Sequence, residues 1–235
     1  MSGLLDLMLP PACAACGMLL EVESPLCPPC RAVLIPLPTP SCVRCSEPGH
    51  FASGACPRCV LNPPAFETAT APFVHDGPLA RAIHRFKYED HPELAVPLGA
   101  LLANGVPGWL RPDEVLLAIP LHAARLYQRK FDQAELLVRS LARGLGRSAG
   151  AKGLERSRAT KRQVGLTEPD RQANLLGAFR VEKGAEVRGR AIVLVDDVFT
   201  TGATARAAAE ALRDAGATSV RILTLARAYS GEGAS

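Results

Sequence analysis

The sequence predicts an α/β protein in which a doubly wound, mainly parallel sheet follows a small cysteine-rich domain. Two patterns lead to this prediction. From Ala65 onward, short apolar runs alternate with helical patterns, which is typical of a parallel sheet with helices on both faces. Before that point lie all eight cysteines, between Cys13 and Cys59. With 235 residues, of which 48% are hydrophobic, the chain is long enough to bury a core.

Residues 1–11 precede both regions. Their apolar stretch LLDLMLPP lacks the basic start and the small-residue cleavage site of a signal peptide. We therefore interpret residues 1–11 as a short N-terminal docking helix. No uninterrupted apolar run approaches the roughly 20 residues of a membrane-spanning helix. We expect a soluble protein that stays in the cytoplasm.

The cysteines form four CxxC pairs, and the spacing CxxC-x10-CxxC occurs twice, with the second copy beginning 29 residues after the first. Two sulfurs that are two residues apart in a tight turn resemble half of a metal site. The repeat indicates an internal duplication with a full set of four ligands in each copy. The candidate ligands are Cys13, Cys16, Cys27, Cys30, Cys42, Cys45, Cys56 and Cys59.

Zinc is the metal that this spacing favours. Disulfides are the alternative, but a cytosolic chain keeps its thiols reduced. Four thiolates leave no open coordination position, so we expect two structural sites in a double zinc ribbon over residues 12–64. The duplication favours sequential sites, and a cross-braced pairing of the first CxxC with the third stays open. Because residues 12–60 hold few other large apolar side chains, metal binding should supply most of their folding energy.

The second domain is expected over residues 65–235. Two prolines and an asparagine in residues 61–64 end any regular element before it. Partial alternation of Thr, Phe and Val over residues 66–75 predicts a strand. Asp76 is a typical N-cap residue, and the apolar side chains after it recur at helical spacing. A second helix is expected over residues 93–103.

The middle of this domain contains one strand, one helix and one loop. Residues 114–120 (EVLLAIP) form a short continuous apolar run, as in a strand that is buried on both faces. An amphipathic helix is expected over residues 131–145, with Asp132 near its start. Residues 151–174 have few large apolar side chains and no clear period. We interpret them as a long mobile loop.

The last elements form a strand, a helix and a strand. Residues 190–195 (RAIVLV) have the pattern of a central strand. An alanine-rich helix follows over residues 203–215, and Gly216 ends it. A further strand is predicted over residues 219–226 (SVRILTLA). This alternation completes the pattern of a doubly wound sheet.

The clearest functional motif is AIVLVDDVFTTGATARAA, residues 191–208. A helix N-terminus presents unpaired N–H groups and a partial positive charge, which favour a phosphate. Asp196 and Asp197, at the carboxyl end of the strand, are placed to accept hydrogen bonds from ribose hydroxyls. The motif predicts a ribose 5-phosphate site, with an ordinary strand-turn-helix as the alternative. The loop residues that would hold the phosphate are Thr200, Thr201, Gly202, Ala203 and Thr204.

These residues resemble the phosphoribosyl pyrophosphate (PRPP) loop of type I phosphoribosyltransferases, although Phe199 stands where a smaller aliphatic residue is more common. With three further segments and the doubled ribbon, almost the whole chain is similar to the ComF family of competence-associated proteins. Two positions, Lys130 and Asp132, differ from the RGFNQ that this family usually shows. The segments are AIHRFKYEDHPELA at 82–95, IPLHAARLYQRKFDQAELL at 119–137 and RSRATKRQVGLTEPDRQANLLGAF at 156–179.

The resemblance implies a phosphoribosyltransferase fold and reaction. A nitrogen nucleophile would displace pyrophosphate from the ribose of PRPP, with Mg²⁺ held mainly by substrate oxygens. Asp196 and Asp197 would fix the sugar. Residues 121–125 correspond to the pyrophosphate loop, so Arg125 and Lys130 would neutralise the leaving group.

Residues 152–175 correspond to the flexible loop that closes over the reaction. Within this loop, residues 156–163 hold four cations and no acid, and a solvated charge run is the alternative. They are Arg156, Arg158, Lys161 and Arg162, of which Arg158 and Lys161 are candidate PRPP ligands.

Two other functions stay open. The chain could be a non-catalytic protein of the DNA uptake machinery that binds single-stranded DNA and uses the PRPP site as a sensor. It could also dock on the DNA-uptake helicase with which the family is associated. Arginine outnumbers lysine 22 to 5, which suits phosphate binding, although codon usage gives the same bias. The sequence identifies neither the acceptor nor the oligomeric state.

Overall fold

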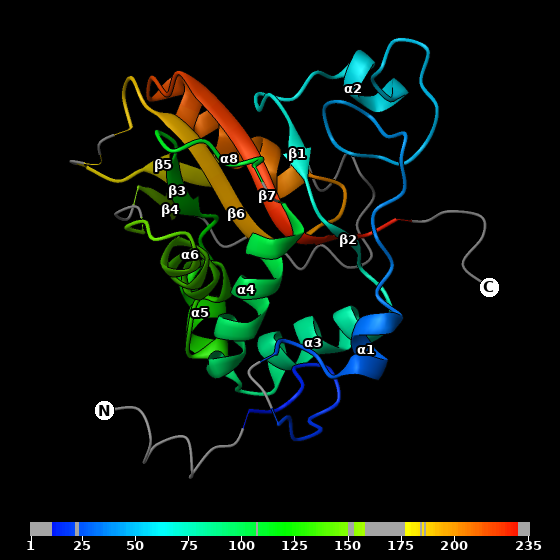
Figure 1. Ribbon diagram of the computed structural model, residues 1–235. Helices are drawn as coiled ribbons and strands as arrows, with labels where there is room; N and C mark the ends of the chain where they lie inside the picture. Colours follow the sequence, from blue (N-terminus) through cyan, green and yellow to red (C-terminus); the bar gives the residue numbers. More distant parts are fainter. Residues whose placement is uncertain are drawn as a thin grey trace.

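The computed structural model of the chain describes residues 11–21, 24–106, 108–149, 153–157, 177–183, 185 and 187–229. At its centre lies a five-stranded parallel sheet with the order β1-β7-β6-β3, in which β2 also pairs with β7 (Figure 1). The predicted α/β fold class is confirmed. The strands are β1 (Ala69–Thr70), β2 (Phe73–Val74), β3 (Val115–Ala118), β6 (Ala191–Phe199) and β7 (Ser219–Arg227).

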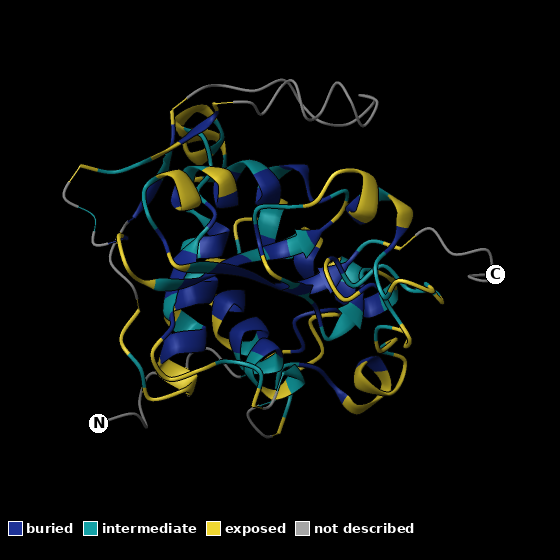
Figure 2. Cartoon of the chain, turned by 90° about the horizontal axis from the view of Figure 1, so that it is seen from above, coloured by how far each residue is buried: buried dark blue, intermediate teal, exposed yellow. Residues whose placement is uncertain are grey.

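Helices cover both faces of the sheet because the central strands are apolar on both sides. In β6, Val193 and Val195 pack with the helices of one face, whereas Ile192 and Leu194 pack with the helix of the other. The first face carries α3 (Gly77–Tyr88), α4 (Ala95–Gly105) and α6 (Gln133–Gly144), and the second carries α8 (Ala203–Asp214). Figure 2 shows these layers as a buried centre with an exposed periphery.

The two cysteine repeats fold alike and lie on opposite faces of the sheet. Each ends in a short helix, α1 (Pro28–Ala32) or α2 (Pro57–Leu61), whose N-cap is a cysteine with a ψ of 157°. In Figure 1, α1 lies beside α3, and α2 lies near the far end of β1. The buried cysteines of each repeat, which are all except Cys16, belong to the hydrophobic core of their own face. Apolar packing therefore stabilises the ribbons in addition to any bound metal, which the sequence did not predict.

The expectation of one long loop over residues 151–174 is wrong in part. Within it, β4 (Leu154–Arg156) pairs antiparallel with β5 (Phe179–Val181) to form a small second sheet. Three residues per strand are too few to show a period, so the pattern could not reveal these strands. The rest of the expected loop, including Arg158, Lys161 and Arg162, lies outside the described residues, as do residues 1–10 of the expected docking helix.

Other boundaries differ from expectation for local reasons. The strand expected over residues 66–75 is divided into β1 and β2 at Pro72, since proline has no N–H to donate to a sheet. A 3₁₀ turn (Pro92–Leu94) precedes α4. The expected loop 121–125 is partly helical, because α5 (Ala123–Arg129) begins within it. No residue of α5 is buried, so it has no apolar stripe from which to predict it. Within the described chain, none of the helices is long and apolar enough to cross a bilayer.

Candidate functional site

The eight cysteines lie in two sequential tetrads. Within each tetrad, the Sγ atoms all lie within 4.8 Å of one another, and the pairing follows the two copies of the repeat rather than a cross-braced scheme. The Sγ atoms of Cys16 and Cys27 are 3.8 Å apart, and those of Cys45 and Cys56 are 3.6 Å apart. Sulfurs bound about 2.3 Å from a tetrahedral zinc ion would lie about 3.8 Å apart. The donor set therefore fits zinc.

The tetrads differ in exposure. All four cysteines of the second tetrad are buried, whereas Cys16 of the first tetrad is exposed. Arg206 on α8 and Arg58 direct guanidinium nitrogens at sulfurs of the second tetrad, at 3.7 Å from Cys59 Sγ and 3.9 Å from Cys45 Sγ. His50, which lies between two ligand pairs in the sequence, is exposed and belongs to neither tetrad.

A cleft of ≈ 620 Å³ opens at the carboxyl ends of β3 and β6. The chain leaves β3 toward helices on one face of the sheet and leaves β6 toward α8 on the other, and such a divergence is where open α/β sheets bind ligands. The lining includes both carboxylates at the end of β6 and cations from three other elements. The polar residues that line it are Lys87, Asp90, Arg125, Gln128, Arg129, Lys130, Arg156, Asp196, Asp197, Thr200, Thr204 and Thr224, together with Tyr88.

The two adjacent acids have different partners. Lys87, on the last turn of α3, lies 2.7 Å from the Oδ1 atom of Asp197, and both side chains are largely buried. Asp196 accepts a hydrogen bond of 2.8 Å from the backbone N–H of Asp197. Burial, and next the negative charge of Asp197, raise the pKa of Asp196 to about 8. The charge of Lys87 thus compensates that of Asp197, and the repulsion between the two carboxylates contributes to the raised pKa of Asp196.

The loop between β6 and α8 forms a glycine-capped helix start. Gly202 is the N-cap of α8 and has a φ of 77°, a left-handed conformation that glycine adopts without strain. A Cβ atom at Gly202 would lie 2.4 Å from the Cζ atom of Phe199, so no side chain fits at this position. Thr201 Oγ1 accepts a hydrogen bond of 3.4 Å from the N–H of Ala203. The N-terminus of α8 therefore opens onto the cleft beside Thr200 and Thr204.

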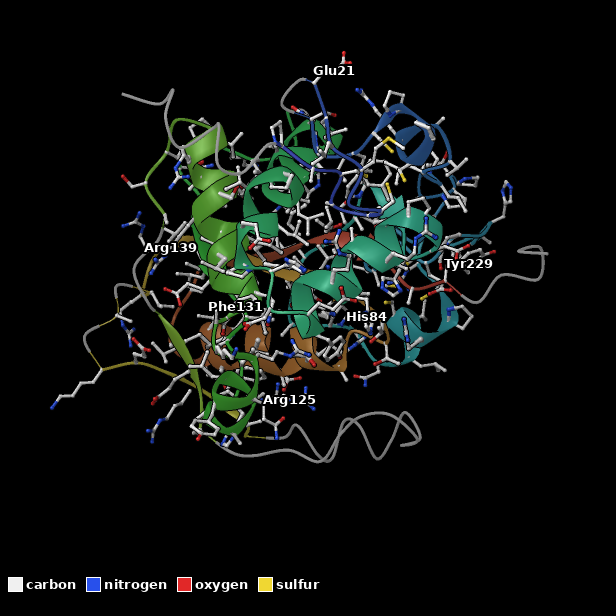
Figure 3. The ribbon with its side chains drawn as sticks, turned by 90° about the horizontal axis from the view of Figure 1, so that it is seen from below. Glu21, His84, Arg125, Phe131, Arg139 and Tyr229 are labelled. Carbon is white, nitrogen blue, oxygen red and sulfur yellow. The ribbon has the colours of Figure 1, made fainter. Side chains whose placement is uncertain are left out.

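Cations also line the cleft. Arg125 lies on α5, where Figure 3 labels it. Arg156, on β4, is 9% exposed, and burial followed by the charge of Arg125 lowers the pKa of Arg156 to about 10. Lys130 ends α5 with a φ of 63° and forms an exposed ion pair with Asp90. These positive charges are placed to face a polyanion.

The two departures from the RGFNQ pattern have clear structural consequences. Lys130 occupies a left-handed position for which glycine is the preferred residue, so the lysine is strained there. Asp132 caps α6 by accepting a hydrogen bond from the N–H of Glu135, and it accepts another of 2.8 Å from the N–H of Leu121. The two bonds go to different oxygens, Oδ1 and Oδ2, so an asparagine, whose amide nitrogen cannot accept, would keep only one of them. Burial raises the pKa of Asp132, so the aspartate keeps both bonds at the cost of burying a charge.

The structure brings most of the predicted site residues together. Asp196, Asp197, Arg125 and Lys130 all line the cleft, as do Thr200, Gly202 and Thr204. Thr201 and Ala203 belong to the same loop but do not line the cleft, and Arg158 and Lys161 lie outside the described residues.

Sequence reasoning missed Lys87 as a site residue. It predicted only the helix that carries this lysine. The contact with Asp197 joins residues 110 positions apart along the chain, so no local pattern shows it. The resemblance of residues 82–95 to the family was the one signal that could have drawn attention to it.

Comparison with known proteins identifies both parts of the chain. A double zinc ribbon domain matches residues 4–60, and a phosphoribosyl transferase domain matches residues 132–235. The chain is 32% identical over 221 residues to the DNA utilization protein YhgH of Escherichia coli O157:H7, covering 92% of this chain and 89% of that protein. It is 29% identical over 223 residues to Competence protein F of Haemophilus influenzae, covering 92% and 96% of the two chains.

Among solved structures, the chain is similar to a glutamine phosphoribosylpyrophosphate amidotransferase from B. subtilis complexed with ADP and GMP. The identity is 22% and the TM-score is 0.40, over 59% of this chain and 30% of that chain.

Proposed function

Since the chain belongs to the ComF family, in which a double zinc ribbon precedes a phosphoribosyltransferase domain, we propose that it binds PRPP and transfers the phosphoribosyl group to a nitrogen acceptor. One observation carries this proposal. A pair of adjacent carboxylates, a helix N-terminus and a cationic wall meet in one cleft, where they match the ribose, the 5-phosphate and the pyrophosphate of PRPP.

Each part of the cleft has a role in this reaction. Asp196 and Asp197 hold the ribose hydroxyls, and the N-terminus of α8 holds the 5-phosphate. The acceptor nitrogen donates its electron pair to the anomeric carbon, the bond from that carbon to pyrophosphate breaks, and pyrophosphate leaves with the electron pair. The nitrogen then loses a proton to solvent. Arg125 and Arg156 lie where they stabilise the charge that develops on the leaving group.

Mg²⁺ would enter with PRPP as part of the substrate. The carboxylate oxygens of Asp196 and Asp197 are ligands of the kind that Mg²⁺ prefers, and it supplies charge neutralisation at the pyrophosphate when bound. The ion pair with Lys87 holds the side chain of Asp197 in place at the cleft. Lys87 therefore prepares the acidic end of the cleft for its ligand.

The nitrogen must come from outside the chain. All eight cysteines belong to the two tetrads, so no cysteine remains to release ammonia from glutamine. The names of the relatives, a DNA utilization protein and a competence protein, support a role in DNA utilisation or competence. We propose that this chain acts in such a context, in the cytoplasm.

A second candidate function is binding of single-stranded DNA without catalysis, in which the PRPP site acts as a sensor. The observation that favours it is the exposure of the cationic wall: the side chain of Lys130 is 70% exposed at the rim of the cleft. Such a rim would also attract a nucleic acid backbone. Docking of the ribbons on a DNA-uptake helicase stays part of this second proposal.

Calorimetry with PRPP and Mg²⁺, followed by a screen for pyrophosphate release with bases and amines, separates the candidates. We expect the double variant with Asp196→Asn and Asp197→Asn to bind PRPP at least about 30-fold more weakly, because it loses a charge-assisted hydrogen bond of the ion-paired Asp197 and a neutral one of Asp196. Asp214→Asn, at the far end of α8, is the matched control. Equal binding by wild type and double variant would refute the site. Normal PRPP binding without pyrophosphate release from any acceptor would favour the sensor.

A further inference from the structure

The second cysteine tetrad and the phosphate loop share one hydrophobic core. Cys42, Cys45, Cys56 and Cys59 belong to the same buried cluster as Phe199, which precedes the loop, and as Ala203 and Ala205, which begin α8. The first tetrad belongs instead to the core on the other face, with α3, α4 and α6. The two metal sites therefore have different relations to the cleft.

Arg206 connects the second tetrad to the phosphate loop directly. It lies in the first turn of α8, where its backbone N–H donates to the carbonyl of Gly202 at 2.8 Å. Its side chain is 7% exposed and points away from the cleft into the ribbon. There one guanidinium nitrogen donates to Cys59 Sγ at 3.7 Å, and another donates to the carbonyl of Asn62 at 2.7 Å. Arg206 thus contacts both a cysteine sulfur of the second tetrad and the helix turn at which the phosphate is proposed to bind.

Phe199 provides a second connection. The ring of Phe199 leaves no room for a Cβ atom at Gly202, so it restricts the path of the loop backbone. Two side chains hold this ring. Phe66, which follows the second ribbon, meets it edge-on at 6.2 Å, and the guanidinium of Arg227 lies 4.8 Å from its centre. Arg227 is itself paired with Glu47, two residues beyond Cys45. A shift of the second ribbon would therefore displace the Phe199 ring, against which the loop packs.

The charge of the metal-loaded second tetrad also connects it to Arg206. Four thiolates and a zinc ion carry a net charge of about −2, and burying that charge is costly unless cations and hydrogen bonds compensate it. Arg206 and Arg58 donate to sulfurs of this tetrad. Partners of this kind around a metal site typically change its affinity by about 10- to 100-fold. The position of Arg206 therefore depends on whether the second tetrad holds its ion.

We propose that Arg206 is a positioning residue that couples metal occupancy of the second tetrad to phosphate binding at the N-terminus of α8, whereas the first tetrad has no such coupling. The proposal rests on the proposed function in one respect, the assignment of a sugar phosphate to this loop. Coupling between two binding equilibria is reciprocal. A ligand at the loop must therefore tighten zinc binding at the second tetrad by the same factor.

The first test is an equilibrium competition between the full-length, zinc-loaded chain and a chromogenic chelator. Ribose 5-phosphate serves as the probe because it needs no Mg²⁺, which the chelator would remove. We expect saturating probe to raise the zinc affinity of one site at least fivefold and to leave the other unchanged. The responsive site should be absent in Cys59→Ser and present in Cys30→Ser, which occupies the same position in the first repeat.

Arg206→Met should abolish this response and weaken zinc binding at the second tetrad about 10-fold or more. Arg213→Met is the matched control, since Arg213 lies on the same helix and bonds only to the carbonyls of Ala217 and Thr218 among the contacts that the structure describes. Probe binding confirmed by calorimetry, without any effect on either zinc affinity, would overturn the coupling and leave the proposed function standing.

A second measurement needs no ligand and decides the case in which the probe does not bind. Hydrogen exchange of residues 199–210 is compared in wild type, Cys59→Ser and Cys30→Ser, each loaded with zinc. We expect faster exchange of this segment in Cys59→Ser only. Absence of probe binding together with this exchange pattern would refute the assignment of a sugar phosphate to this loop, and with it the coupling to phosphate, and would support only a structural link between the second tetrad and the loop. Equal exchange in the two variants would refute the coupling itself.

Discussion

Asp196 and Asp197 are neighbours in the sequence, but only one of them has a lysine beside it. The pKa of Asp196 is raised to about 8, chiefly by burial, from an ordinary value near 3.8. Between pH 3.8 and about pH 8, Asp196 keeps its proton in the native chain but has lost it in the unfolded chain. The free energy of unfolding therefore falls as the pH rises toward 8. This stability is fully present below pH 4, and it is lost as the pH passes through the native pKa.

We predict that Asp196→Asn removes this pH dependence. Between pH 6.5 and 8, wild type should lose roughly 2 kcal/mol more stability than the variant, at 1.36 kcal/mol for each pH unit. Urea unfolding in the presence of zinc at the two pH values measures the difference. Asp214→Asn should follow wild type, because that carboxylate is exposed. Parallel stability curves for wild type and Asp196→Asn would contradict the burial of a protonated carboxyl at this position.

Lys130 allows a second prediction at the scale of one residue. Its φ of 63° costs a non-glycine residue about 1 kcal/mol, and its exposed ion pair with Asp90 returns little of that. We expect Lys130→Gly to leave the free energy of unfolding unchanged or slightly higher. PRPP binding should weaken about fivefold through loss of one screened charge, whereas ribose 5-phosphate should bind as before. Calorimetry with both ligands checks this, and an equal loss for both would show that Lys130 does not contact the pyrophosphate.

The sequence predicts a site residue only where the residues that act with it lie close by in the chain. The acids, the threonines and the glycine of the loop lie within nine positions of the chain, so their chemistry could be deduced from the sequence. Lys87 and Arg156 reach the same cleft from α3 and β4, and only the tertiary fold places them there. The cysteine spacing likewise predicts two tetrads but not that they lie on opposite faces of the sheet.

At the scale of elements, long periodic segments were predicted well and short ones were missed. The helices α3, α6 and α8 follow their apolar stripes, and Asp76 and Asp132 cap the first two by accepting backbone hydrogen bonds. By contrast, β4, β5 and α5 are held by their neighbours and have no pattern of their own. These unpredicted elements contribute Arg156 and Arg125 to the cleft.

A prediction at the scale of elements concerns the loop that joins β6 to α8. Gly202→Ala would place a Cβ atom 2.4 Å from Phe199 and force alanine into a left-handed conformation. We expect a loss of stability of about 1 to 3 kcal/mol and a loss of ribose 5-phosphate binding that exceeds what the stability change explains. Thermal unfolding and calorimetry on one sample separate the two effects.

Gly144→Ala is the control for this substitution. Gly144 lies in α6, and a Cβ atom there would meet nothing within 4 Å. Alanine should therefore be neutral or stabilising by up to about 1 kcal/mol. If Gly202→Ala behaved in the same way, the loop would be free to move away from Phe199, and its geometry could not be the basis of phosphate binding.

At the scale of the whole molecule, the ribbons are parts of two cores rather than appendages. Cys13 and Leu26 pack with Ile83 and Phe86 of α3 on one face, and the second tetrad packs with Phe66 on the other. Arg85 of α3 also donates to the carbonyl of Ala14 at 2.9 Å. Removing zinc should therefore destabilise the α/β domain as well as the ribbons.

The single tryptophan makes this prediction measurable. Trp109 packs against Arg221, with the guanidinium 3.7 Å from the ring, so its fluorescence reports on the α/β domain. Structural zinc contributes about 10 kcal/mol or more to folding in small zinc domains, and about half of that would shift the Tm of a chain of this size by more than about 10 °C. We expect a strong chelator to lower the tryptophan-detected Tm by at least that amount. If zinc leaves the protein and this transition does not move, the ribbons fold independently of the sheet.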